Sequence, residues 1–231
     1  EFGKIIIGEK KRLSILAIDP SSIKSKGSIL GDKTRMDFLS RSENVFIRPT
    51  ATGFTLGGVA RNTRESILLC EAANYNVIIV ETVGVGQSEI SAHSMVDFFL
   101  VLMLSGAGDE LQGIKRGIME LADAILITKA DGQNVNLAKQ AKQQIKNALH
   151  LFPAKENNWT PITETCSSKE KLNIHLAWEI INDFFTIQSK NGWLKSNRIE
   201  QQIQAFNSTL QSKIYQDFIG KEKEYIKHLE N

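Results

Sequence analysis

The chain has few of the residues from which metal sites, disulfide scaffolds and membrane spans are built. Its 231 residues contain only two cysteines, Cys70 and Cys166, and four scattered histidines. These counts exclude a disulfide framework and a multi-cysteine zinc site, and we expect both cysteines to be buried as small apolar residues. The longest apolar run, residues 98–104, is much shorter than the ~20 residues that span a bilayer. We therefore expect a soluble, cytoplasmic protein with no membrane partner.

Aromatic residues and excess charge are also scarce. Aromatic residues make up 7% of the chain, and 28 basic against 26 acidic side chains leave a formal net charge of +2. Proteins that bind nucleic acid through phosphate contacts carry a larger positive charge, so no nucleic acid is expected as a partner. The hydrophobic share of 42% is ordinary for a folded soluble protein, and a chain of this length buries enough surface to fold without a metal.

Four short apolar runs predict the strands of an open sheet. Near-continuous apolar runs of this length suit strands that are covered on both faces, and stretches with helical spacing separate them. The alternation predicts an α/β fold in which a mostly parallel sheet carries helices on both faces. The expected strands are residues 13–18, 77–80, 98–104 and 124–127, and the expected helices are residues 63–73, 111–122 and 136–149.

From about Leu172 onward, the sequence predicts helices only. Apolar residues recur there at intervals of three or four, which places them in one stripe along a helix. We therefore divide the chain into a domain of residues 1–171 and a helical arm of residues 172–231. The stripe either packs back on its own domain or pairs with another chain. Its members, the apolar stripe from here on, are Ile199, Ile203, Phe206, Leu210, Ile214 and Phe218.

Acidic residues and glycines follow the expected strands. In open α/β sheets, ligands bind beyond the carboxyl ends of the strands. Asp19 follows the first run, and Glu81-Thr82-Val83-Gly84 follows the second in the order of a Walker B strand. An acid in this place can hold Mg²⁺, and the amide of Gly84 can sense a γ-phosphate.

The segment Thr128-Lys129-Ala130-Asp131 after the fourth run matches the [NT]-K-x-D pattern of guanine-specific nucleotide binders. In that pattern the Asp131 carboxylate accepts two hydrogen bonds from the base, and the Lys129 stem lies along it. The segment therefore favours guanine over adenine.

Longer motifs resemble those of one family, the MeaB/ArgK-type G3E P-loop GTPases, which are chaperones of adenosylcobalamin-dependent methylmalonyl-CoA mutase. The resemblance implies a P-loop NTPase-type fold, GTP/GDP and Mg²⁺ as ligands, the mutase as partner, and a homodimer formed through the helical arm. The motifs are D-P-S-S at 19–22, G-S-I-L-G-D-K-T-R-M at 27–36, T-L-G-G-V-A-R at 55–61, residues 80–89, and L-S-G-A-G-D-E-L-Q-G-I-K-R-G at 104–117.

The resemblance also implies roles for single residues. Asp19 and Asp32 resemble the metal-side carboxylates, and Glu81 resembles the Walker B acid. Residues 109–115 resemble the family's extra switch, in which Lys115 would be a mobile cation able to pair with Glu81. Thr165, Cys166 and Ser167 would back the guanine base through main-chain amides, beside Lys129 and Asp131. Thr128 stands where the family more often has Asn, which weakens the bracing of the loop.

Several of these residues have structural alternatives. Asp32 can pair with Lys33 or Arg35 on the surface, and Lys115 can be a solvated helix lysine. Arg61 and Arg64, one helical turn apart, either form a solvated face or contact an anionic partner.

A P-loop of the form G-x-x-x-x-G-K-[ST], which cradles phosphates, does not occur in these residues. Residues 1–12 resemble the end of the helix that follows the P-loop in the family. We therefore expect a GTPase in the intact protein and no activity from this stretch alone. Two other functions stay open: an ATPase or kinase linked to lysine/arginine/ornithine transport, which the guanine pattern disfavours, and a nucleotide-free dimeric interaction module.

Overall fold

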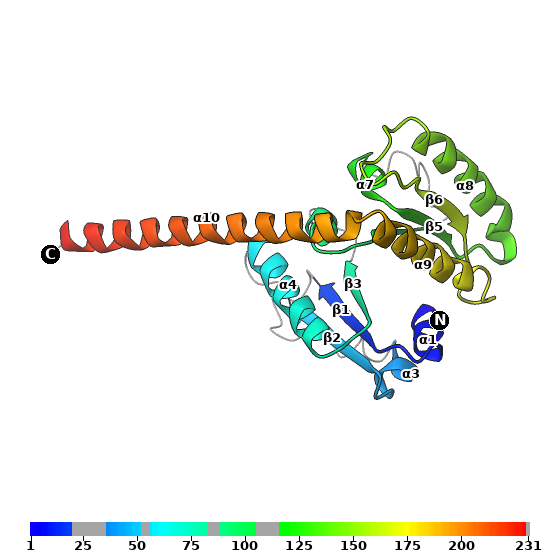
Figure 1. Ribbon diagram of the computed structural model, residues 1–231, viewed down its shortest axis with the longest axis horizontal. Helices are drawn as coiled ribbons and strands as arrows, with labels where there is room; N and C mark the ends of the chain where they lie inside the picture. Colours follow the sequence, from blue (N-terminus) through cyan, green and yellow to red (C-terminus); the bar gives the residue numbers. More distant parts are fainter. Residues whose placement is uncertain (20–35, 52–55, 83–87, 105–115, 230–231) are drawn as a thin grey trace.

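The computed structural model describes residues 1–19, 36–51, 56–82, 88–104 and 116–229 (Figure 1). Its strands form two parallel sheets of three strands each, in the orders β2-β1-β3 and β4-β5-β6. Two of the strands, β2 and β6, were not foreseen from the sequence. The strands are β1 (Leu13–Asp19), β2 (Val45–Ala51), β3 (Val77–Thr82), β4 (Leu100–Leu104), β5 (Ala124–Thr128) and β6 (Ile162–Thr165).

Helices connect the strands, as the alternating pattern predicts. The expected helices at 63–73 and 136–149 are confirmed as parts of α4 and α8, whereas α7 covers residues 116–121 of the expected 111–122. Residues 111–115 lie outside the described part of the chain. The helices are α1 (Phe2–Gly8), α3 (Asp37–Ser40), α4 (Leu56–Ala72), α5 (Ser88–His93), α7 (Arg116–Leu121), the 3₁₀ turn η2 (Gly132–Asn134), α8 (Val135–Leu149), α9 (Ile174–Lys190) and α10 (Trp193–Leu229).

Strand β1 is the centre of the first sheet. Leu13 pairs with Val45 of β2 on one side and with Val77 of β3 on the other. Every residue from Leu13 to Ile18 is at most 5% exposed, because the strand has neighbours at both edges and helices on both faces. The continuous apolar run that predicted this strand follows from that burial.

Strand β5 has the same position in the second sheet. Ile125 and Ile127 pack on one face in a cluster with Ala141 and Ile145 of α8. Alternate residues of β5 point to the opposite face, where Leu126 packs with α9. The run of residues 124–127 is buried throughout for this reason.

Helix α9 packs against both sheets. Trp178 belongs to the apolar cluster of β1 and β2, and its indole Nε1 donates to Glu9 Oε1 at 2.7 Å. Ala177, one residue earlier, packs with Leu126 of β5, and Phe184 lies in a third cluster with Ala124. Thus α9 joins the two sheets, although the sequence predicts a single one.

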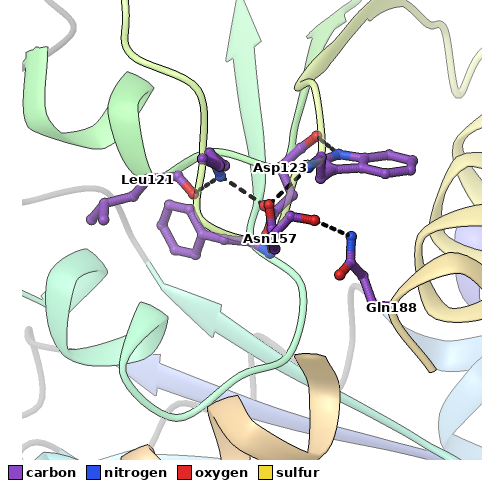
Figure 2. Close-up of polar contacts among 7 residues, drawn as sticks. Leu121, Asp123, Asn157 and Gln188 are labelled. Carbon is purple, nitrogen blue, oxygen red and sulfur yellow. Dashed lines mark hydrogen bonds and ion pairs between the residues drawn. The ribbon is translucent and has the colours of Figure 1, made fainter. Parts of the chain in front are cut away.

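A buried polar network lies at the amino end of β5 (Figure 2). Asp123 is 5% exposed, and its carboxylate accepts from the Phe99 amide at 2.8 Å and from Lys155 Nζ at 2.7 Å. Lys155 also donates to the Leu121 carbonyl, and the Trp159 indole donates to the Asp123 carbonyl. A buried carboxylate is stable only when such partners replace water, and this one has them.

The last helix, α10, extends away from the rest of the molecule (Figure 1). It has 37 residues, which is longer than the helix of about five turns that the stripe predicts. All members of the apolar stripe are exposed, from 46% for Leu210 to 67% for Phe218. The stripe therefore does not fold back on its own domain in this structure.

Two further expectations concern burial and membranes. Cys70 and Cys166 are both buried free thiols, as expected. Among the described residues, no helix combines the length and the apolar character that crossing a bilayer requires.

Candidate functional site

The segment after β5 is fixed to the neighbouring strand by backbone hydrogen bonds. The Cys166 amide donates to the Ile127 carbonyl at 2.8 Å, and the Ala130 amide donates to the Cys166 carbonyl at 3.0 Å. These bonds continue the pairing of β5 with β6 past the ends of both strands. They place Asp131 directly beyond the carboxyl edge of the second sheet, where ligands of such sheets bind.

The Asp131 carboxylate is oriented by one buried hydroxyl group. Ser167, which is completely buried, donates a short hydrogen bond from Oγ to Asp131 Oδ2. The same oxygen of Ser167 accepts from the Glu170 amide at 3.1 Å, so the hydroxyl hydrogen is directed at Asp131. Among the described residues, Oδ1 of Asp131 has no hydrogen-bond partner. One edge of the carboxylate is therefore held and the other is open to a ligand.

Lys129 and Thr128 complete this loop. Lys129 adopts a left-handed backbone with φ of 54° and has an exposed side chain. Thr128 Oγ1 donates to the Met103 carbonyl of β4 at 2.7 Å. Although the shorter Thr side chain was expected to brace the loop less well than Asn, it does make a bracing bond, and that bond runs to the neighbouring strand.

The amides of Cys166 and Ser167 are already occupied within the protein. The Cys166 amide bonds to Ile127, and the Ser167 amide donates to the Leu172 carbonyl at 3.0 Å. Contacts from these two amides to a base would have to compete with those bonds. Burial raises the pKa of the Cys166 thiol, so the thiol is neutral and is not an activated nucleophile. The Thr165 carbonyl accepts from Asn173 Nδ2 at 2.8 Å, which fixes the turn behind Asp131.

The expected metal ligands belong to the other sheet. Asp19 ends β1 and Glu81 lies near the end of β3. Ala17 pairs with Glu81 and Ile18 with Thr82, so Asp19 lies one position beyond the last pair of this ladder. Glu81 has an exposed side chain. The structure thus brings two acidic positions to adjacent strand ends, which is where the sequence predicts them.

Other predicted residues lie outside the described part of the chain, namely Asp32, Gly84 and Lys115. Within the described residues, no group of three His, Cys, Asp or Glu side chains could hold a metal ion. The assignment of Asp19, Asp32 and Glu81 to Mg²⁺ therefore stays a prediction, and so does the pairing of Lys115 with Glu81.

Arg61 and Arg64 have different surroundings, which the sequence could not distinguish. Arg61 forms an exposed ion pair with Glu65 at 2.9 Å. Arg64 donates to the Ser94 carbonyl at 3.1 Å, and burial lowers its pKa. Arg64 therefore braces α4 against the segment after α5, and Arg61 belongs to the solvated face.

The side-chain role of Ser167 was missed by the sequence analysis. The T-C-S segment was selected for its main-chain amides, and the hydroxyl of Ser167 is the group that contacts Asp131. Only the pairing of β5 with β6, which brings residues 36 positions apart together, reveals this contact.

Several known proteins resemble this chain over most of its length. Residues 1–223 match the family described as methylmalonyl Co-A mutase-associated GTPase MeaB. The chain is 47% identical over 203 residues to "GTPase ArgK" of Escherichia coli (strain K12), a match that covers 88% of this chain and 61% of that protein. It is 46% identical over 200 residues to "Methylmalonic aciduria type A homolog, mitochondrial" of Mus musculus, covering 87% of this chain and 48% of the relative.

A solved structure is similar throughout the chain. The crystal structure of an LAO/AO transport system kinase superposes with a TM-score of 0.78 at 36% identity. The superposition covers 96% of this chain and 65% of the kinase. The chain spans less than two thirds of the length of each of these relatives.

Proposed function

Because the chain belongs to the methylmalonyl Co-A mutase-associated GTPase MeaB family, we propose that the full-length protein binds and hydrolyses GTP and acts as a chaperone of an adenosylcobalamin-dependent methylmalonyl-CoA mutase. The observation that carries the nucleotide part is the Asp131 carboxylate, one oxygen of which is held by Ser167. The open oxygen and the position at the carboxyl edge of β5 suit the two hydrogen-bond donors on the Watson–Crick edge of guanine. The mutase part rests on the family description and on the mouse relative.

Hydrolysis proceeds by in-line attack of water on the γ-phosphate, and the protein contributes positioning and charge neutralisation. Glu81 and Asp19 at adjacent strand ends offer the hard oxygen ligands that Mg²⁺ prefers. Bound Mg²⁺ would neutralise charge on the phosphates. Glu81 would hold the metal or its water, and Asp131 with Lys129 would hold the base.

The test of base recognition is Asp131→Asn in the full-length protein. The Asn amide replaces one of the two acceptor oxygens by an NH₂ donor, which would face a donor of guanine, and charged hydrogen bonds contribute about 1.5–3 kcal/mol each. We expect the dissociation constant for GTP to rise on the order of 100-fold and XTP to gain affinity. Unchanged GTP affinity without a gain for XTP would refute the assignment.

Glu81→Gln tests the hydrolytic half separately. It should abolish Mg²⁺-dependent hydrolysis while GDP affinity stays near wild type, because the acid serves the γ-phosphate side. Glu65→Gln on α4, which removes only an exposed ion pair, is the control. Hydrolysis by the Glu81 variant at the wild-type rate would make Glu81 structural.

The same binding experiment separates GTP from ATP. A preference for ATP would favour a kinase function such as the name of the LAO/AO transport system kinase suggests. The open Asp131 carboxylate supports GTP, because the six-position amino group and N1 of adenine do not present two donors to it.

We also propose that the phosphate cradle lies in a part of the protein outside this chain. Within the described residues, β3 pairs only with β1, and β4 pairs only with β5. Leu100 of β4 packs against the buried cluster of Leu126 and Ala177, whereas Leu102 and Leu104, on the same face of the strand, are 64% and 47% exposed. An added parallel strand between β3 and β4, followed by a helix leading to α1, would cover them. Its connecting loop would lie at the carboxyl edge, near Glu81.

Thiol labelling tests this placement. A cysteine at position 102 should react slowly in the full-length protein because the added strand and helix cover it. A cysteine at Leu151, which is 85% exposed, serves as the control for free access. Equal reaction rates at the two positions would contradict the added strand.

Finally, we propose that the apolar stripe of α10 forms a homodimer. A contiguous apolar surface on an extended helix usually marks association, and two-fold dimers are the commonest assembly. Phe206→Asp, in the middle of the stripe, should give monomers that melt near the wild-type temperature. Asn207→Asp, the next residue, should leave the dimer intact. A wild-type protein that light scattering finds monomeric at high micromolar concentration would refute the proposal.

A further inference from the structure

We propose that Arg198, in the first turns of α10 (the root of α10 below), couples nucleotide binding at the carboxyl edge of the sheets to the direction of α10. The residue acts through other residues and touches no ligand, so it is a positioning residue. The proposal rests on the proposed function, since a nucleotide must bind at the carboxyl edge for coupling to occur.

Arg198 binds two acidic side chains from different elements. Its Nε and Nη2 donate to the two oxygens of Asp97 at 2.7 and 2.6 Å, and its Nη1 donates to Glu71 Oε1 at 3.1 Å. The side chain of Asp97 is only 17% exposed, so this forked pair is shielded from solvent on one side. The hydrogen bonds with Asp97 raise the pKa of Arg198, which keeps the guanidinium charged at any physiological pH.

A second contact from the same helix reaches the same place. Gln201, three residues further along α10, donates to the Val96 carbonyl at 2.9 Å. On the opposite side, Arg64 of α4 donates to the Ser94 carbonyl. The segment of residues 94–97, called the α5–β4 link below, is therefore held between α4 and α10.

The two helices whose ends lead to Arg198 both start near the carboxyl edge of the first sheet. Helix α5 starts at Ser88, six residues after the end of β3 with its Glu81, and leads into the α5–β4 link. Helix α4 starts five residues after the end of β2 and carries Glu71 in its last turn. Each helix runs back from the carboxyl edge of a sheet toward the amino edge. Arg198 joins the far end of α4, at Glu71, to the α5–β4 link, at Asp97.

A shift of either helix would move the root of α10, because a forked arginine–carboxylate pair fixes direction as well as distance. Helix α10 has 37 residues, which at 1.5 Å per residue makes a rod of about 55 Å. A tilt of about 5° at its root would therefore displace its end by about 5 Å. The shape of the arm thus amplifies a small change at the site into a change that a partner on α10 can detect.

The test measures the distance between arm and domain in the full-length protein. Spin labels are attached to cysteines introduced at Lys213 of α10 and Lys139 of α8, both exposed. An excess of unlabelled protein removes distances between protomers. The distance distribution is recorded without nucleotide, with GDP and with a non-hydrolysable GTP analogue, while nucleotide affinity is measured on the same samples.

The variants are Arg198→Met and Asp97→Asn, with Lys195→Met, an exposed residue one turn earlier on α10, as the control. We expect the wild type and the control to shift between GDP and the GTP analogue. Both test variants should lose the shift and give a broader distribution even without nucleotide. Arg198→Lys, which keeps the charge but loses the fork, should be intermediate.

The outcomes separate the two proposals. A shift that persists in Arg198→Met and Asp97→Asn overturns the coupling. A wild type that binds GTP without any shift also overturns the coupling but leaves the GTPase proposal intact. A wild type that binds no GTP overturns the GTPase proposal, which the affinity measurement shows directly. A melting temperature recorded for each variant shows whether it has folded.

Discussion

The two ends of strand β5 carry two aspartates with opposite surroundings. At the amino end, both carboxylate oxygens of Asp123 have donors, one from the Phe99 amide and one from Lys155. At the carboxyl end, the only donor that the described residues give Asp131 is Ser167, on Oδ2. Asp123 is 5% exposed, whereas Asp131 is only partly buried.

The difference separates a carboxylate that stabilises the fold from one that can take part in binding. A carboxylate whose oxygens all have protein partners stabilises the fold and has no capacity left for a ligand. A carboxylate that the described residues hold on one side only still has acceptor capacity for a ligand. Figure 2 shows how closely the amino end is filled, since Asn157 there also connects to Gln188 of α9.

Removing the charge of each aspartate in turn tests whether their contributions to stability differ. Asp123→Asn in the full-length protein leaves the partly buried Lys155 charge with the Leu121 carbonyl but without its carboxylate, and breaking a buried ion pair costs about 3–5 kcal/mol. Asp131→Asn should cost less than about 1 kcal/mol, because Ser167 can still donate to the amide oxygen. Urea denaturation of both variants checks this. Equal losses would mean that Asp131 is as structural as Asp123.

A double variant refines the first prediction. Lys155→Met alone leaves the Asp123 charge with one donor fewer, and it should destabilise the protein by about 2–4 kcal/mol. Combined with Asp123→Asn, the loss should be smaller than the sum of the two single losses, because residues in contact are coupled. An additive result would show that the two groups do not stabilise each other.

At the carboxyl end, Ser167→Ala should weaken both binding and stability. The variant keeps the Asp131 charge but frees the carboxylate to rotate, and one hydrogen bond to a charged group is worth about 1.5–3 kcal/mol of stability. We expect GTP affinity to fall by about 10-fold or more, and the free energy of unfolding to fall by less than in Asp123→Asn. Ser189→Ala, at an exposed position near the end of α9, is the control. An unchanged affinity would remove Ser167 from the site.

The smallest expected effect is a pH dependence at the amino end. Burial lowers the pKa of His93, which lies near Asp123 and Lys155, below the usual value of about 6.5. The unfolded chain therefore takes up a proton at higher pH than the folded one. The free energy of unfolding should fall as pH drops from about 6.5 through the lower folded pKa.

His93→Phe should flatten this slope, since Phe also fits the edge contact with Phe99. Urea denaturation of the wild type and the variant between pH 5 and 7.5, a range around the usual histidine pKa, measures the slope in both proteins. An equal slope in the two would contradict the assignment to His93.

The apolar runs predicted four of the six strands, because a strand buried on both faces needs consecutive apolar residues. Strand β2, V-F-I-R-P-T-A, was missed because Arg48 and Pro49 interrupt its apolar run. Strand β6, I-T-E-T, was missed because it is short and polar. Glu164 in it forms an ion pair with Lys142 of α8, a contact that local patterning cannot reveal.

For the site, the residue types and their places at strand ends were predictable, since motifs such as Thr128–Asp131 follow directly from a strand. The partners of those residues were not. Ser167 meets Asp131, and Arg198 meets Asp97 across 101 positions of sequence, only because of tertiary packing. Such contacts depend on which strands and helices are neighbours, which no local pattern contains.

In the described part of the chain, β3 and β4 each have one edge without a partner strand, and these edges bear on how this chain behaves by itself. Along each edge, backbone N–H and C=O groups can template a strand from another molecule. Exposed Leu102 and Leu104 on β4 add apolar side chains to that hazard. Both strands are mostly apolar and contain no proline, which is the residue that most often blocks edge-to-edge pairing. We therefore expect intermolecular β-pairing to limit the solubility of this chain in isolation, and charged substitutions along β4 to raise it.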